Sequence, residues 1–503
     1  MPMLPSVRTR VAVLVGLAAL GAVACGVKDS GVTAIEARAG AGGGLFPTES
    51  TVTGDTTPVE PTYEVIPGVV DFGSNKEARD YDGFLTAAFG DIQDFWAQAY
   101  PEAYGGEWVP LQAGIYAAYP DRVETIPGCG NEFSSYEDVW SRGAFYCRPD
   151  DFMAYDDYEL LPSLVAELGK EAVAVVLAHE FGHAVQFRAG TAEQAVILKE
   201  QQADCFAGAW SAHVASGGSN LIFFDDADVR AGLIAMLQIR DPVESGGLLN
   251  PDAHGTGFDR VGAFQDGFVG GVTRCATFFD ENRLDNLIDI QFDATDPNAG
   301  NLPLIDPAPD PDLGAADIVT LIPASLDYFW VALAEANSVP FTAPTFEAFP
   351  SAGPYPTCDG VDQGAFQGNV VFCPTNNVIY WDQDTAAVLA ADPLTGDLSV
   401  GYLFSNAYSD AIQTALRSQR TGEPRALMND CLTGAWVVSI VPQMAAEDSV
   451  IVLSAGDLDE AVITAIARSD EATDTNINGS AFEKVDAFRT GVLGGLNVCR
   501  DLG

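Results

Sequence analysis

The sequence predicts an α+β protein that consists of two copies of one domain, each with helices around a small sheet. Three observations lead to this prediction. Along 173–190, apolar residues recur at spacings of three and four, which is typical of an amphipathic helix, and Gly190 is a suitable end. The stretch 153–156 is typical of a short strand. Segments of the chain also recur in one order with a period of about 226 residues, which indicates a tandem repeat.

The N-terminus has the features of an export signal. Arg8 and Arg10 precede an apolar run over 11–24, which is too short to span a bilayer. The run ends in Ala-Val-Ala-Cys, which fits cleavage before Cys25 and also resembles a bacterial lipobox. We therefore expect 1–24 to be a signal peptide and the mature chain to be exported, either as a cell-envelope lipoprotein anchored through Cys25 or as a secreted protein. No later segment is expected to span a membrane, so membrane contact would go through that anchor.

Composition divides the rest of the chain. The stretch 25–67 is rich in Gly, Thr and Pro and predicts a flexible tether. The Pro- and Asp-rich stretch 296–311 predicts an interdomain linker, so the two domains are expected at 68–295 and 312–503. With 24 basic and 71 acidic residues the chain has a net charge of −47, which would repel phosphate backbones. Nucleic acid is therefore not an expected partner.

One motif on the predicted helix, HEFGH, indicates a metal site. His179 and His183 are four residues apart, so both imidazoles leave one face of the helix, one turn apart. This spacing lets two neutral nitrogens bind one Zn²⁺, with Glu180 beside the metal as a general base for water. The alternative interpretation is a pair of core histidines next to a surface glutamate.

Comparison of the two repeats favours the metal site. The second repeat has lost, as a set, the residues that a zinc site would use, while the framework around them is kept. The replacements are His179 by Asn406, Glu180 by Ala407, His183 by Asp410, Glu200 by Ala426 and His254 by Asn478. Because Asp204 is kept as Asp430 whereas Glu200 is lost, we predict Glu200 as the third metal ligand. Asp204 is predicted to be structural, and it could orient a ligand histidine.

The cysteines fit an exported chain. Without Cys25, eight cysteines remain, an even number. Because each repeat has four equivalent positions, the repeat narrows the pairings. The predicted disulfides are Cys129–Cys147, Cys205–Cys275, Cys358–Cys373 and Cys431–Cys499.

The first repeat resembles the bacterial family of neutral zinc metallopeptidases over about residues 70–285. The segments HEFGHAVQ, EQQADCFAGAW and GAFYCRPDD and a His-Gly pair carry the resemblance. It implies a zincin-like fold, Zn²⁺ as cofactor, His179 and His183 as ligands and Glu180 as catalytic base. Glu200 fits the third-ligand position by similarity to gluzincins. The second repeat resembles the family only in its framework, so we predict a degenerate pseudo-peptidase domain there.

The predicted function is that of an exported zinc peptidase with peptide or protein substrates. Glu180 would take a proton from the attacking water and deliver it to the leaving amine. His254 is predicted to act in catalysis as a donor to the oxyanion, although it could instead cap the turn at Gly255. The strand at 153–156 is considered as an edge strand that could pair with a substrate. His213 is expected to be a packing or surface residue.

Two other functions stay open at this point. The chain could be a non-enzymatic binding or scaffold lipoprotein of the cell envelope with a vestigial metal site, or a metal-dependent hydrolase of non-peptide amides. The intact set of site residues in the first repeat favours the peptidase over the scaffold, because the second repeat shows what a lost site looks like.

Overall fold

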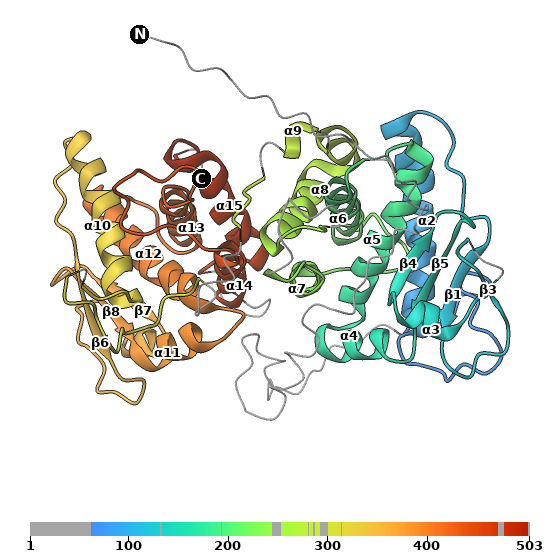
Figure 1. The fold of residues 1–503 in the computed structure, drawn as a ribbon, viewed down its shortest axis with the longest axis horizontal. Coiled ribbons are helices and arrows are strands. Elements are labelled where there is room, and N and C mark those ends of the chain that lie inside the picture. Colours follow the sequence, from blue (N-terminus) through green and yellow to red (C-terminus); the bar gives the residue numbers. More distant parts are fainter. Residues whose placement is uncertain are drawn as a thin grey trace, which may run out of the picture.

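The computed structural model describes residues 62–130, 133–192, 194–243, 253–279, 281–284, 287–291, 300–312, 314–470 and 477–500. The predicted signal peptide, the Cys25 anchor and most of the tether lie outside the described residues. Two helical halves, each with a small sheet, make up the described chain. The two sheets lie at opposite ends of the molecule, and α7, α8, α14 and α15 lie between them (Figure 1). This arrangement confirms the α+β fold class.

The described part of the first half contains eight helices and five strands. Its helices are α2 (Asp82–Tyr104), α3 (Tyr136–Trp140), α4 (Leu160–Leu168), α5 (Lys170–Ala189), α6 (Val196–Ala215), α7 (Asp226–Gln238), α8 (Gly257–Phe278) and α9 (Glu281–Leu284). Its strands are β1 (Gly114–Ala118), β2 (Ile126–Pro127), β3 (Phe133–Ser134), β4 (Ala144–Cys147) and β5 (Phe152–Asp156). β2 pairs with β3, and the other three strands form a sheet in the order β1-β5-β4.

The strand predicted at 153–156 is confirmed as part of β5, but its interpretation as an edge strand is wrong. β5 is the central strand, parallel to β1 on one side and antiparallel to β4 on the other. Both of its edges are therefore already hydrogen-bonded, and it cannot take up an extended peptide. Sequence periodicity does not reveal this order, because the β1–β5 pairing joins segments that are distant in the chain.

The second half has a sheet of the same pattern. Its elements are α10 (Ile318–Ala336), β6 (Thr345–Phe349), η3 (Gln363–Phe366), β7 (Val370–Cys373), β8 (Val378–Asp382), α11 (Gln383–Ala391), α12 (Gly396–Ala415), α13 (Glu423–Val438), α14 (Asp457–Ala467) and α15 (Ala481–Cys499). The strand order is β6-β8-β7, with β6 parallel and β7 antiparallel to β8.

The helix predicted at 173–190 is confirmed as α5, but it is not amphipathic. Every residue from Ala172 to Gln186 is buried, including both histidines. The helix is enclosed because α2, α4, α6, α7 and β4 all pack against it. A helix that is buried on all sides shows no polar face, so the polar residues in its middle must find partners inside the protein.

The four predicted disulfides are confirmed. Cys129–Cys147 and Cys358–Cys373 each close a short loop beside a sheet, while Cys205–Cys275 joins α6 to α8 and Cys431–Cys499 joins α13 to α15. These helix pairs are very close. A Cβ on Gly208 would lie 1.9 Å from the Phe264 carbonyl oxygen, so the crossing of α6 and α8 requires glycine.

We expected that no segment after the signal peptide could span a membrane, and the length and composition of one helix contradict this expectation. Within the described chain, α10 is long and apolar enough to do so, and 28% of its most apolar 18-residue stretch is buried. The buried residues include Ile318, Ile322, Leu326 and Trp330, which belong to the core of the second half.

The halves meet through helices that flank the predicted site. Arg240, just after α7, lies 3.1 Å from the Asp459 carboxylate of α14, and the Phe258 backbone N–H of α8 donates to the same side chain at 2.8 Å. The Phe268 and Phe482 rings are 4.7 Å apart between α8 and α15. The start of α8 is thus held from both halves.

Candidate metal centre

Helices α5 and α6 bring the three predicted metal ligands together. His179 Nε2 lies 3.3 Å from Glu200 Oε2, and His183 Nε2 lies 3.6 Å from Glu200 Oε1. One potential ligand atom from each residue lies within 4.8 Å of the other two, and all three side chains are buried. This donor set of two imidazole nitrogens and one carboxylate fits Zn²⁺ and leaves a fourth position for water or substrate.

A glycine between the two histidines permits this approach. A Cβ on Gly182 would lie 3.0 Å from the Ala203 Cα, so α6 passes directly over this point of α5. Ala203 lies between Glu200 and Asp204 in the sequence. The small residue therefore lets α6 bring both acids to the histidines, a contribution that sequence reasoning missed.

Neighbouring charges shift the pKa values of Glu200 and His179. Burial alone would raise the pKa of Glu200, but the charges and hydrogen bonds of His183 and His179 hold it well below its usual range. Burial would lower the pKa of His179, yet the Asp204 carboxylate and Glu200 raise it to about 9. A cation at this position would therefore compete with a proton on His179.

His179 is oriented by an acid, as predicted for Asp204. His179 Nδ1 lies 2.6 Å from Asp204 Oδ1, which directs Nε2 towards Glu200. The buried Arg260 guanidinium of α8 donates to both Asp204 oxygens, at 2.8 Å and 2.9 Å. Sequence reasoning missed Arg260, although the repeat held a signal: Lys484 occupies the corresponding position in the second half.

His183 has a partner of its own. Its Nδ1 lies 3.0 Å from Gln186 Oε1, and the Gln186 amide donates to the Lys199 carbonyl at 2.6 Å. The contact orients the His183 ring in the manner that neighbours of metal-binding histidines usually provide. The second repeat has Gln413 at the corresponding position.

Glu180 lies beside the ligands with unused hydrogen-bonding capacity. It is buried next to His179, and its Oε2 atom accepts no hydrogen bond from any residue that the structure describes. Burial raises the pKa of Glu180, while the nearby His179 and His183 oppose that shift. An unsatisfied buried carboxylate oxygen indicates a missing partner, and water at a metal centre would supply one.

His254 lies near the three residues without joining their group. Its backbone N–H donates to Asp241 Oδ2 at 2.6 Å, and its Nδ1 lies 3.0 Å from Asp241 Oδ1. Burial would lower the pKa of His254, but Asp241 and the charge of Glu200 raise it. It is Asp241, not the imidazole, that caps the turn, since it also accepts the Gly255 N–H at 2.9 Å. His213 is a packing residue, with its ring 5.1 Å from that of Phe95.

Comparisons with known proteins cover this same region. Residues 64–278 match the family model described as "Putative neutral zinc metallopeptidase". The uncharacterized protein YpfJ of Escherichia coli (strain K12) is 30% identical over 219 residues, which span 39% of this chain and 70% of that protein. The uncharacterized protein Rv2575 of Mycobacterium tuberculosis (strain H37Rv) is 31% identical over 201 residues, 34% of this chain and 66% of its own length. No solved structure matches the chain.

Proposed function

The chain belongs to the putative neutral zinc metallopeptidase family, and from this premise we propose that it is an exported zinc-dependent peptidase that hydrolyses peptide bonds with its first half. The convergence of His179, His183 and Glu200 beside the unsatisfied Glu180 carries the proposal. A vestigial site in a non-enzymatic scaffold would have no need to keep a complete donor set together with a buried base.

Each residue of the site has a distinct proposed role. His179, His183 and Glu200 would hold Zn²⁺, which when bound polarises a carbonyl and makes water more acidic. Glu180 accepts the proton of the attacking water and passes it to the leaving amine. Asp204 keeps His179 in the tautomer that has Nε2 free for the metal, since the Nδ1 proton faces the carboxylate.

His254 is proposed as the donor that stabilises the oxyanion. In the second half, Asn478 makes the same contacts to Asp470 that His254 makes to Asp241, through its backbone N–H at 2.6 Å and its side chain at 2.8 Å. The loop can therefore be built without an imidazole. The ring of His254 is then available for a chemical role, and the charge of Glu200 acts on it.

We propose further that the second half is a degenerate copy of the first without a metal centre. The equal strand order and the equivalent disulfides support this. Asp430 accepts hydrogen bonds from Asn406 at 2.7 Å and Lys484 at 2.8 Å, much as Asp204 does from His179 and Arg260. The positions of the ligands hold Asn406, Asp410 and Ala426, and Asp410 pairs with Arg425.

Export is proposed on two grounds. The four disulfides suit an oxidising compartment, and the N-terminal sequence has the features of a signal peptide that ends at a possible lipidation site, Cys25. Peptides or proteins outside the cytoplasm are the proposed substrates. Lipid anchorage and simple secretion are distinguished by labelling cells with a fatty acid and comparing the wild-type chain with Cys25→Ser.

The test of the peptidase is Glu180→Gln, compared with Glu171→Gln as a matched control on the same helix. Glu171 lies in the first turn of α5, where it pairs with Lys170 at 2.9 Å. We expect Glu180→Gln to retain one zinc per chain and to cleave casein or a peptide library about 10²–10⁴-fold more slowly, because the general base is lost. Glu171→Gln should cleave normally.

Two outcomes would contradict the proposal. Equal cleavage by zinc-loaded Glu180→Gln and wild type would show that Glu180 is not the base. Wild-type protein that binds zinc but cleaves no member of a broad peptide library would favour the scaffold, or a hydrolase of non-peptide amides, which small amide substrates would reveal.

A further inference from the structure

Three carboxylates of the second half meet away from the candidate metal centre. Asp397 belongs to the first turn of α12, and Asp457 and Glu460 belong to the first turn of α14. They are only 7%, 4% and 6% exposed, and one oxygen of each lies within 4.8 Å of the other two. We call these residues the acidic cluster. Neither the family match, which ends at residue 278, nor the zinc chemistry involves them.

Neutral groups are the cluster's only described hydrogen-bond donors. The Leu302 backbone N–H donates to Asp397 Oδ2 at 2.8 Å, and the Leu398 N–H donates to Glu460 Oε2 at 2.8 Å. Among the described residues, no lysine or arginine forms an ion pair with any member of the cluster. The nearby Arg240 pairs with Asp459, which is not a member. Burial, and for Asp457 and Glu460 also mutual repulsion, raise the pKa values of the three carboxyls.

One oxygen of the cluster lacks a partner. Asp397 Oδ1 is buried and accepts no hydrogen bond from the described part of the chain. Asp397 comes from a different helix than the other two acids, and one of its oxygens lies within 4.8 Å of an oxygen of each of them. A buried carboxylate oxygen without a partner is costly. It indicates a ligand that accepts electron pairs.

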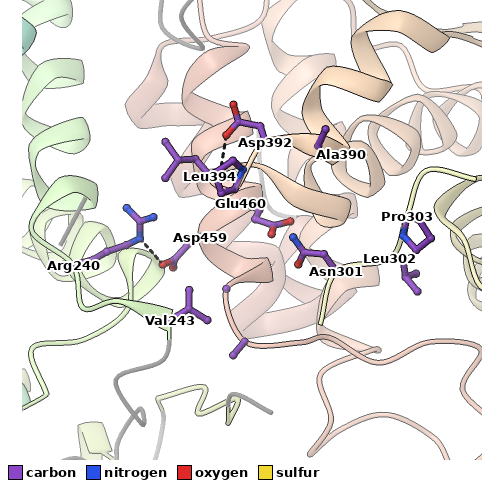
Figure 2. Close-up of a pocket in the computed structure, with 14 residues that line it drawn as sticks. Arg240, Val243, Asn301, Leu302, Pro303, Ala390, Asp392, Leu394, Asp459 and Glu460 are labelled. Atoms are coloured by element: carbon purple, nitrogen blue, oxygen red, sulfur yellow. Dashed lines mark hydrogen bonds and ion pairs between the residues drawn. The ribbon is translucent and has the colours of Figure 1, made fainter. Parts of the chain in front are cut away.

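Space for such a ligand exists beside Glu460. A Cβ on Gly396 would lie 2.1 Å from Glu460 Oε1 and 2.5 Å from the Asn301 side-chain amide, so these two side chains pack against residue 396 and require glycine there. Figure 2 shows Glu460 and Asn301 side by side in the wall of a cavity of about 420 Å³, with Arg240 and Asp459 on the side of the first half. Of the three acids, Glu460 lines this cavity, so an ion in the cavity could reach the cluster at the Glu460 carboxylate.

We propose that Asp397, Asp457 and Glu460 bind a divalent cation and that this cation is Ca²⁺. All donors are oxygens, which hard cations prefer, and there is no histidine or cysteine among them. Oxygens up to 4.8 Å apart can share one Ca²⁺, because Ca–O distances are about 2.3–2.6 Å. The three carboxyls, with no lysine or arginine of the described chain paired to them, would exchange their protons for the cation.

The position of the cluster defines what binding would do. Asp397 accepts a hydrogen bond from the backbone N–H of Leu302, which lies in the segment that connects the two halves. The first turn of α14, which carries Asp457 and Glu460, also carries Asp459, the acceptor of the Phe258 N–H at the start of α8. Bound Ca²⁺ would thus fix the turn to which the first half is attached. The inference does not depend on the proposed peptidase activity.

Calorimetric titration of the full-length, metal-stripped chain with CaCl₂ tests the site, in about 0.3 M NaCl to screen the acidic surface. We expect one saturable site per chain. The Tm should rise by roughly 5 °C when Ca²⁺ exceeds its Kd about a hundredfold. Asp397→Asn and Glu460→Gln should abolish both signals. Without Ca²⁺, Asp397→Asn should have a Tm equal to or above that of wild type, because a repulsive charge is removed.

Asp392→Asn is the matched control, because Asp392 is equally buried at 7% exposure and lines the same cavity without belonging to the cluster. It should bind Ca²⁺ like wild type. The inference is overturned if wild type shows no saturable site with about 10 mM Ca²⁺, or if Asp397→Asn and Glu460→Gln respond to Ca²⁺ as wild type does. The titration needs neither zinc nor substrate, so its failure would leave the peptidase proposal standing.

Discussion

Asp204→Asn tests whether Asp204 stabilises the metal centre, the fold or both. Asp204 is fully buried and contacts His179 Nδ1 at 2.6 Å and the Arg260 guanidinium at 2.8 Å and 2.9 Å. Asparagine keeps the size of the side chain but removes its charge. Arg260, only 1% exposed, then loses its counter-charge. Breaking a buried pair costs about 3–5 kcal/mol, and we expect about 3 kcal/mol here because the asparagine oxygen still accepts one bond.

A second effect concerns zinc alone. Without the carboxylate, His179 loses the charged acceptor that fixes its tautomer and raises its basicity, so zinc affinity should fall about 10–100-fold. The loss of about 3 kcal/mol should lower the Tm by roughly 6–12 °C. Zinc affinity is measured by competition with a chromophoric chelator at a temperature well below the transition, and the Tm by calorimetry.

Asp430→Asn is the matched control. Asp430 is also fully buried and also accepts from a basic side chain, Lys484, at 2.8 Å. The same change should lower the Tm comparably while zinc affinity and cleavage stay at wild-type values. If Asp204→Asn lowers the Tm but leaves zinc affinity unchanged, Asp204 is purely structural and the orientation argument fails. An equal loss of zinc affinity in Asp430→Asn would show that the second half takes part in metal binding.

Two further predictions follow from the contacts. His254→Asn should keep zinc content and Tm, because Asn478 makes the same contacts to its own aspartate, but should lower kcat about 10²–10³-fold; an unchanged kcat would assign His254 to the loop alone. In calcium-free protein, burial raises the pKa of Asp397 to about 6, so ionising this carboxyl costs the folded state more than the unfolded chain, and stability should fall by about 1.4 kcal/mol between about pH 5 and pH 7. Denaturant unfolding at both pH values should show this decline, and Asp397→Asn should remove it.

The sequence predicted those parts of the fold that repeat along the chain. Each cysteine has a counterpart at an equivalent position, so comparison of the repeats left one natural set of disulfides, which the structure confirms. The environment of α5 could not be predicted in the same way. Its apolar periodicity indicates one buried face, whereas α6 and α7 cover the others. Only the tertiary contacts decide that its polar residues are internal.

The site was predictable where chemistry depends on local spacing. His179 and His183 are separated by one helical turn, and their loss together with Glu200 in the second repeat pointed to a common task. The roles of Arg260 and Gln186 were not predicted, because both contact other protein side chains rather than the expected ion. Arg260 also reaches the site from a helix that is distant in the sequence. Such supporting residues have no local spacing rule, but a charge kept at the same offset in both repeats, as in Arg260 and Lys484, can indicate them.

The comparison also explains why Asp204 and Asp430 persist while the residues around them differ. A buried carboxylate needs donors whether or not a metal is near, and Asp430 obtains them from Tyr402 at 2.5 Å, from Asn406 and from Lys484. Asn406 occupies the place of His179 and supplies the same donor without a metal-binding nitrogen. If the second half is a degenerate copy, as we propose, losing the ligands costs it little stability, whereas losing the acid would leave Lys484 buried without a counter-charge. The contacts of Asp430 thus account for it through the fold alone, whereas we propose that His183 and Glu200 of the first half serve the metal centre.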